Sequence, residues 1–156
     1  MTSTSPKKWG NGWENDLVKL VQLKGWVSIR IPDSCKRIGR GKIVPIRSPF
    51  DFCFAKNGVV VFADAKTLEG PTFSNSSCNR SQLAHLIALE TTARCVAGYI
   101  VFHRSINRVT FYRASTLWAL RPGNGLRITD GIDLGSLHDL DLERVLILQN
   151  AAARGI

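Results

Sequence analysis

The sequence predicts a single mixed α/β domain, and three observations support this prediction. Apolar residues recur at helical spacing near the N-terminus and again in the middle of the chain. Between and after these helices lie short alternating or β-branched runs that are typical of strands. Two such runs are separated by Asn57-Gly58, the strongest short signal for a β-hairpin. A chain of 156 residues is long enough to form one domain with a substantial hydrophobic core.

The elements are expected in the order helix, three strands, helix, two strands, helix. The helices in this order cover 11–24, 80–94 and 114–120, and the strands cover 26–31, the two arms of a hairpin at 49–66, and 98–104 and 108–113. A further helix is expected in the tail, at 137–154.

Three parts of the chain are distinguished by composition. Residues 1–10 are polar and carry two lysines, so we expect a flexible basic arm there. Residues 11–120 hold the periodic segments of the main domain. The sequence RPGNG at 121–125 then breaks the chain. Residues 121–156 are expected to be an extension that either belongs to the same domain or makes a dimer contact.

The balance of charge favours a polyanionic partner. Lysine and arginine number 21 and aspartate and glutamate 12, which gives a formal net charge of +9. Nucleic acid is the first candidate for the partner and an anionic membrane surface the second. No apolar stretch is long enough to cross a bilayer. Nucleic acid is preferred of these two candidates, so no membrane partner is expected. Four separated cysteines without a CxxC pair favour free thiols and a cytoplasmic location over a zinc site.

Two aspartates lie inside the predicted hairpin, in positions that a buried sheet would usually give to valine. If Asn57 and Gly58 form the turn, opposed residues have numbers that sum to 115, and Asp51 and Asp64 meet that condition. Their Cβ atoms would then be roughly 4.5–5.5 Å apart on one face. Lys66 points to the same face because side chains alternate along a strand. Opposed like charges destabilise a hairpin unless something neutralises them, and a divalent cation does so.

The alternative for this pair is that both aspartates lie on a solvated face. Against it, Val60 and Phe62 share that face, so it is not a plain polar surface. Glu14 is a third candidate acid, beside the apolar stripe of the first helix. A glutamate in that position is usually a boundary residue, and it matters here only if the helix packs against the hairpin.

The segments SPFDFCFA and FADAK resemble the signature of the PD-(D/E)XK nucleases, with Pro49 and Asp51 followed by residues 64–66. The proline lies one position further from Asp51 than the name of the motif implies, and aspartate replaces the commoner glutamate at position 64. A helical glutamate, Glu14, lies upstream, and a helix with Gln82 follows. Within this superfamily the chain is most similar to the Holliday junction resolvases of the archaeal Hjc and bacterial RecU types.

The resemblance covers roughly residues 10–118. It implies a restriction-endonuclease-like fold, in which a mixed central β-sheet is flanked by helices, and it makes 11–120 a nuclease domain. It also implies Mg²⁺, for which Mn²⁺ can substitute, bound by Asp51, Asp64 and the carbonyl of Ala65. These hard oxygen ligands suit such ions.

The remaining roles come from the same resemblance. Glu14 would hold the metal ion or its water. Lys66 would orient the attacking water and stabilise charge on the phosphorus, and Gln82 would support Lys66 from the following helix. Hydrolysis of a phosphodiester needs a nucleophile near neutral pH and neutralisation of the developing charge, which metal ions supply.

A basic loop or small flap at residues 32–47 is the expected DNA contact, because cations are concentrated there beside the nuclease motif. A solvated loop is the alternative. The candidates for DNA binding are Ser34, Lys36, Arg37, Arg40, Lys42, Arg47 and Thr67.

The expected substrate is a four-way or otherwise branched DNA, cut at two symmetric positions. Two cuts are most simply made by a homodimer. The candidate dimer surfaces are Leu117, Trp118 and Leu120, or the apolar tail around Val145 to Leu148. Two other functions stay open. One is a nuclease of the same fold that acts on another DNA, in restriction or repair. The other is a non-catalytic DNA-binding module, which would need a degraded motif.

Overall fold

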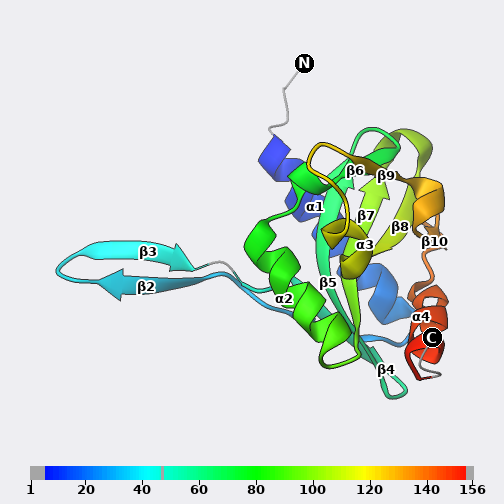
Figure 1. Cartoon of the computed structure of the whole chain (residues 1–156), viewed down its shortest axis with the longest axis horizontal. Helices are drawn as coiled ribbons and strands as arrows, with labels where there is room; N and C mark the ends of the chain where they lie inside the picture. The colour runs from blue at the N-terminus through cyan, green and yellow to red at the C-terminus, as the bar shows by residue number, and fades with distance from the viewer. Residues whose placement is uncertain (1–5, 47, 154–156) are drawn as a thin grey trace.

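The protein is described by a computed structural model of residues 6–46 and 48–153, with side chains placed for 12–33, 39–42 and 48–150. Its centre is a six-stranded sheet in the order β1-β4-β5-β7-β8-β10 (Figure 1). Only β5 and β7 are parallel, because α2 connects them as a crossover. The strands are β1 (Val27–Arg30), β4 (Phe52–Lys56), β5 (Val59–Leu68), β7 (Val96–His103), β8 (Arg108–Arg113) and β10 (Ile132–Gly135).

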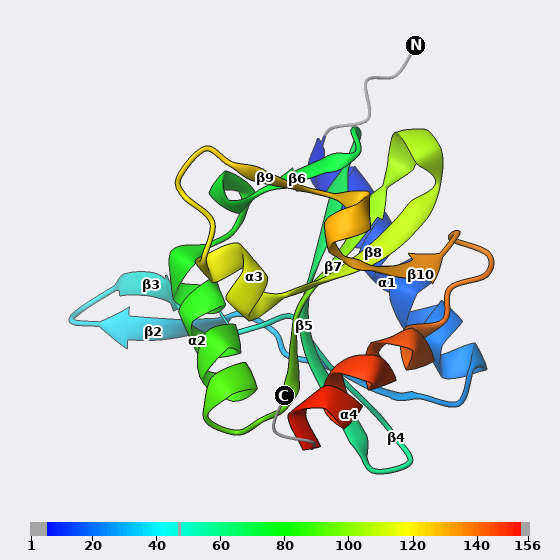
Figure 2. The same cartoon turned by 45° about the vertical axis from the view of Figure 1, so that its right-hand side comes forward.

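Helices cover both faces of this sheet, so the predicted fold class is confirmed (Figure 2). On one face, α1 (Pro6–Leu23) packs Trp13, Leu17 and Val21 into a core that includes Ala63 and Ala65 of β5. The 3₁₀ turn η4 (Leu142–Val145) and α4 (Leu146–Ala153) lie on the same face. On the other face, α2 (Arg80–Thr91) and α3 (Ala114–Trp118) enclose a second core. Alternate residues of β5 therefore serve different cores.

The turn between β4 and β5 has the geometry that the sequence predicts. Asn57 and Gly58 have φ angles of 50° and 79°. Two positive φ values identify a type I′ turn, which is the turn that fits the twist of paired strands. The register follows, with Phe52 opposite Ala63 and Phe54 opposite Val61. These numbers sum to 115, so the predicted pairing is confirmed along the hairpin.

The basic segment at 32–47 forms a second hairpin that projects from the body of the molecule (Figure 1). Its strands are β2 (Ser34–Ile38) and β3 (Lys42–Ile46), and together they make a separate two-stranded sheet. Of the two predicted forms, a basic loop or a small flap, the structure shows the flap. Gly39 and Gly41, with φ angles of 62° and 87°, make the tight reversal, and Pro45 is tolerated because no third strand needs its missing N–H.

The last third of the chain completes the same domain. A small sheet pairs β6 (Thr72–Ser74) with β9 (Gly125–Arg127), and β10 extends the central sheet. Leu134, Leu140 and Val145 are buried in the first core. The sequence did not predict these short strands because their few residues include glycine and aspartate, which weaken any strand pattern. The last helix begins at Leu146 and not at 137, after the η4 turn.

Two candidate dimer residues belong to the interior. Leu117 and Val145 are both fully buried, so they cannot form a surface in the folded monomer. Both residues are apolar because they pack into the interior, Leu117 from α3 into the second core and Val145 from η4 into the first. Trp118 and Ile147 are the exposed members of those two segments.

The first helix begins at Pro6 and not at 11, so part of the expected arm is helical. Proline suits the first turn of a helix, where its missing N–H has no partner to lose. Residues 1–5 lie outside the described part of the chain. Within that part, no helix combines the length and the apolar character needed to cross a membrane.

Candidate nuclease site

Asp51 and Asp64 lie side by side at the end of the β4–β5 hairpin. Asp64 is on β5, and its side chain is almost fully buried. Asp51 immediately precedes β4, and its carboxylate Oδ2 accepts a hydrogen bond from the backbone N of Ala65 at 3.1 Å. Its carbonyl accepts from the backbone N of Ile31 at 2.8 Å, which ties it to the end of β1. The predicted pairing of the two acids is therefore present, and the solvated-face alternative is excluded for Asp64.

The Asp64 carboxylate lacks the donors that usually accompany a buried charge. Within the described residues, neither of its oxygens accepts a hydrogen bond of good geometry. Lys66 compensates in part, with its Nζ 2.9 Å from Oδ2 of Asp64. Burial and then the neighbouring Asp51 raise the pKa of Asp64 to about 7, against the opposing effect of Lys66. Asp64 is thus a carboxylate whose ionised form needs more positive charge than the protein supplies.

Lys66 is held between these acids. Its side chain is 30% exposed. Burial alone would lower the pKa of its ammonium group, but the Asp64 carboxylate outweighs this effect, and the net pKa is raised. Lys66 therefore stays protonated at neutral pH, with part of the ammonium group reachable from solvent.

Glu14 approaches the same place from α1. Its carboxylate forms an ion pair with Arg30 at the end of β1. Burial raises the pKa of Glu14, and the charge of Asp51 raises it further, while Arg30 and Lys66 act in the opposite direction. Glu14, Arg30 and Asp51 also line one open hollow, together with Asp33 and Ser48. The first helix thus packs against the hairpin, and Glu14 is part of the site.

Gln82 reaches the site from the first turn of α2, with its side chain buried. Asn79 caps this helix by accepting hydrogen bonds from Ser81 N and Gln82 N. The Gln82 amide Nε2 donates to the carbonyl of Ser48 at 3.2 Å, and its Oε1 has no partner among the described residues. In the described structure Gln82 therefore anchors the segment before Asp51, and no hydrogen bond joins it to Lys66.

The residues present fit a divalent cation. Asp51 and Asp64 offer neighbouring carboxylates, and among the described residues neither oxygen of Asp64 accepts a hydrogen bond of good geometry. The carbonyl of Ala65 points to the same side of β5 as its N–H, and so toward Asp51. Among the described residues no three acids, histidines or cysteines converge closely enough to hold an ion by themselves. Mg²⁺ does not require three such side chains, since it is usually held by one or two carboxylates plus waters and substrate phosphates.

The predicted DNA-binding residues divide into three groups. Arg40 lies at the tip of the projecting hairpin with Lys42 beside it, and both are exposed. Ser34, Lys36 and Arg37 belong to β2, but their side chains lie outside the described part, as does the whole of Arg47. The hydroxyl of Thr67 is buried and lacks a partner among the described residues, which does not favour the predicted phosphate contact.

Three residues at this site were missed by sequence reasoning. Arg30 pairs with Glu14, while the carboxylate Oδ1 of Asp33 accepts a hydrogen bond from the backbone N of Ser48 at 2.7 Å. The only sequence signal is that IRIPDS places charged residues directly after a strand. Their relation to Glu14 and Asp51 depends on tertiary packing, which no local pattern encodes.

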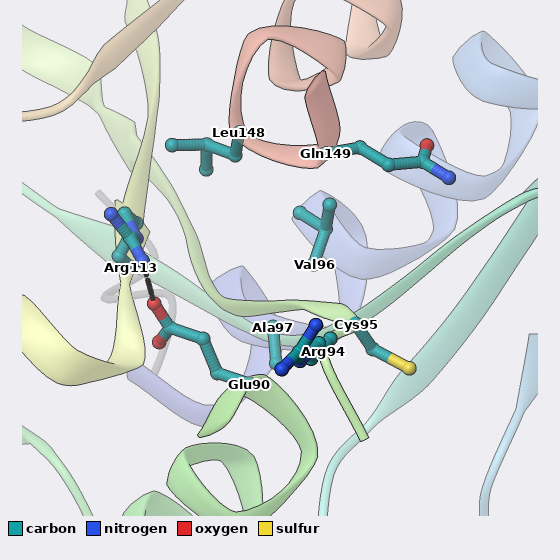
Figure 3. A pocket seen from close by; sticks show the side chains of 8 residues that line it. All are labelled: Glu90, Arg94, Cys95, Val96, Ala97, Arg113, Leu148 and Gln149. Carbon is teal, nitrogen blue, oxygen red and sulfur yellow. Dashed lines mark hydrogen bonds and ion pairs between the residues drawn. The ribbon is translucent and has the colours of Figure 1, made fainter. Parts of the chain in front are cut away.

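A second hollow lies at the C-terminal end of α2, and its polar side chains join two helices (Figure 3). The Glu90 carboxylate there accepts hydrogen bonds from Arg113 Nε at 2.7 Å, from Ser115 N at 2.8 Å and from Ser115 Oγ at 2.7 Å. These contacts use both of its oxygens to join α2 to the start of α3. None of the predicted site residues lines this hollow.

Comparison with solved structures finds proteins of the same fold. The solved structure of Hjc, a Holliday junction resolvase from the archaeal hyperthermophile Archaeoglobus fulgidus, superimposes with a TM-score of 0.56. The match covers 80% of this chain and 95% of that one, at 15% sequence identity. The chain has the fold of this Holliday junction resolvase. No protein-family model and no curated protein sequence matches the chain.

The match to Hjc bears on the architecture and not on the chemistry, because similarity at this level of identity shows the fold alone. It confirms the restriction-endonuclease-like sheet, and the resemblance to PD-(D/E)XK nucleases of the Hjc type holds at the level of the fold. The acids, lysine and glutamine described above are evidence independent of that match.

Proposed function

We propose that this protein is a Mg²⁺-dependent endonuclease that resolves four-way DNA junctions by paired symmetric cleavage. The observation that carries the proposal is the buried Asp64 carboxylate. It lies beside Asp51 and within 2.9 Å of Lys66, and among the described residues it has no hydrogen-bond donor of good geometry. A buried carboxylate without good hydrogen bonds lowers the stability of the fold. Side chains with strongly shifted pKa values are concentrated at functional sites.

Each residue of the site has a distinct role in the proposed reaction. Asp51, Asp64 and the carbonyl of Ala65 would hold Mg²⁺, with Mn²⁺ as a substitute. The ion would supply a hydroxide-like nucleophile near neutral pH and neutralise charge on the phosphate. Lys66, which stays protonated, orients the attacking water and stabilises the charge that develops at the phosphorus. Glu14, partly exposed and paired with Arg30, would hold the metal ion or its water.

The projecting hairpin is the proposed DNA clamp. Arg40 and Lys42 are exposed on it, and its sequence adds Lys36, Arg37 and Arg47. The hairpin returns to the body at Ser48, whose carbonyl is bound by Gln82 and whose N–H is bound by Asp33. Phosphate contacts made along the hairpin would therefore position the strand over the carboxylates, independently of sequence.

A homodimer is part of the proposal, because two symmetric cuts need two sites. The surface that fits best is the edge strand β1, since Leu117 and Val145 are buried. On β1, Val27 is 60% exposed and Ile29 is 54% exposed. Their register opposite Ala55 and Cys53 places them on one face, and β1 is the last strand of the sheet on that side. An exposed apolar edge strand favours pairing with a second copy.

The main alternative is the same chemistry on another DNA, as in restriction or repair. Cleavage of a synthetic four-way junction, compared with linear duplex and single strand of the same sequence, separates the two. A non-catalytic DNA-binding module is disfavoured, because every position of the motif holds a residue competent for catalysis.

A further inference from the structure

An exposed aromatic residue lies where α3 ends, next to the start of α2. Trp118 is 45% exposed, and the guanidinium carbon of Arg80 lies 4.7 Å from the centroid of its ring. The two helices pack against each other, and Figure 2 shows α3 beside α2. Trp13 and Trp26, by contrast, are buried in the core.

This pair is close to the nuclease site. Arg80 is two residues before Gln82, whose amide binds the carbonyl of Ser48. Burial raises the pKa of the Cys78 thiol to about 11, and the charges of Lys66 and Arg80 both lower it. One buried thiol is therefore coupled electrostatically to a residue of the nuclease site and to a residue of the stacked pair.

The surface around the pair is basic and is fixed by hydrogen bonds. Asn75, just before α2, donates from its side-chain Nδ2 to the carbonyls of Leu120 at 3.2 Å and Arg121 at 3.3 Å. These bonds tie the backbone at Leu120 and at the exposed Arg121 to the segment just before α2. Within the described residues no carboxylate forms an ion pair with either arginine. The guanidinium groups are thus available to an anion.

We propose that Arg80 and Trp118 form a stacking site for a nucleobase that the branch point of the DNA leaves incompletely stacked. The indole takes the base, and the guanidinium held against the same ring takes the phosphate beside it. Aromatic side chains bind bases without regard to sequence because every base has a π-face, and basic groups beside them follow the backbone. The inference rests on the proposed function and adds to it a reason for preferring branched over continuous DNA.

The test measures binding without divalent cation, so that cleavage does not enter. The probes are a fluorescently labelled four-way junction and a linear duplex of the same length. Trp118→Ala should weaken junction binding by about tenfold, in keeping with the loss of one stacked base, and should change duplex binding by less than about twofold. Trp118→Phe should retain most of the affinity. Arg80→Ala should lower the log–log salt slope by about 0.9, the value for one phosphate contact.

A matched control is Ile147→Ala, which removes an exposed apolar side chain from α4, on the other face of the sheet. It should bind both DNAs as the wild type does. Thermal melting of each variant checks the fold, and light scattering checks the mass. Quenching of intrinsic fluorescence by the junction should be smaller in Trp118→Phe than in the wild type.

Two results overturn the inference: Trp118→Ala binds the junction as the wild type does, or it loses affinity equally for both DNAs. A loss of mass in Trp118→Ala would also overturn it and make Trp118 a dimer contact. A wild-type protein that binds the junction but cuts no DNA would overturn the proposed nuclease instead. The ratio of junction affinity to duplex affinity in Trp118→Ala, compared with that ratio in the wild type, would still decide whether the stacking site exists.

Discussion

The backbone N–H of Ala65 donates a hydrogen bond to Oδ2 of Asp51, with 3.1 Å between the two atoms. This bond joins the residue before β4 to the middle of β5, where the hairpin ladder has already ended at Phe52 and Ala63. It fixes the Asp51 carboxylate beside Asp64 by means of the backbone. The geometry of the pair is therefore set by the fold, whichever residue occupies position 64.

Asp51→Asn and Asp64→Asn should each lower the rate of DNA cleavage by at least about a hundredfold. Each change removes a metal ligand while keeping the size of the side chain, and an amide oxygen at position 51 can still accept the bond from Ala65. DNA affinity should be equal or higher, because a negative charge that repels phosphate is lost. Gel-based cleavage and binding assays measure the two effects. Lys66→Ala should also lose cleavage but keep metal affinity, and near-normal activity in any of the three would remove that residue from the mechanism.

Stability without metal should fall as pH rises toward 8. The pKa of Asp64 is raised from 3.8 to about 7 by burial and by Asp51. Between these values the folded state holds a proton that the unfolded state has lost, so folding is favoured at the lower end of this range and disfavoured above it. Thermal melting at pH 5 and pH 8 in a chelator measures the effect.

Asp64→Asn is the matched control for this pH dependence. The melting temperature of Asp64→Asn should fall less between pH 5 and pH 8 than that of the wild type. This variant should also be more stable than the wild type at pH 8. Added Mg²⁺ or Mn²⁺ should raise the melting temperature of the wild type at pH 8 and leave that of Asp64→Asn nearly unchanged. An equal response to metal in both proteins would contradict a cation at Asp64.

Neutralising Arg37, Arg40 and Lys42 together should weaken junction binding and lower its salt dependence. Each lost phosphate contact reduces the log–log slope by about 0.9, so three contacts reduce it by about 2.7. Titrations between low and moderate salt give the slope. Neutralising Lys19 and Lys24 on α1 and after it gives a control, since both are exposed and lie outside the hairpin. An unchanged slope in the triple variant would place the hairpin off the DNA.

Glu90→Ala should destabilise the fold by about 1–3 kcal/mol without changing the nuclease site. The substitution leaves Arg113 and the N–H of Ser115 without the carboxylate that joins α2 to α3. Glu69→Ala should cost about 0.5 kcal/mol or less, because Glu69 is 71% exposed and its ion pair with Arg104 is solvated. Denaturant unfolding compares the two. Equal losses would mean that the Glu90 contacts contribute little.

The sequence predicted those features that are local or periodic. The Asn57-Gly58 turn sets the register by itself, and Asp51 lies one residue beyond the last paired residues, Phe52 and Ala63, where it is bound by the backbone N of Ala65. The helical spacing of Trp13, Leu17 and Val21 predicts which side of α1 is buried. These patterns were sufficient to predict the local structure. A turn type determines which residues of the two strands face each other, and a helical period determines which side chains share one side of the helix.

Other features depend on contacts between distant segments and could not be predicted. The last strand of the sheet, β10, has four residues, and its place beside β8 follows from packing of the chain after it. Leu117 and Val145 carry no sequence signal that separates core from surface. Gln82 was predicted to support Lys66, whereas its amide donates to the carbonyl of Ser48, at the end of a hairpin whose reversal contains two glycines with positive φ.

The measurement that tests the central claim most directly is strand-by-strand mapping of cuts in a synthetic four-way junction, with Mg²⁺ and with a linear duplex as the competing substrate. The account predicts two nicks at symmetric positions on opposing strands and faster cleavage of the junction than of the duplex. Both nicks should be absent in Asp64→Asn. Equal cutting of junction and duplex would contradict the resolvase, and binding without any cutting would contradict the nuclease.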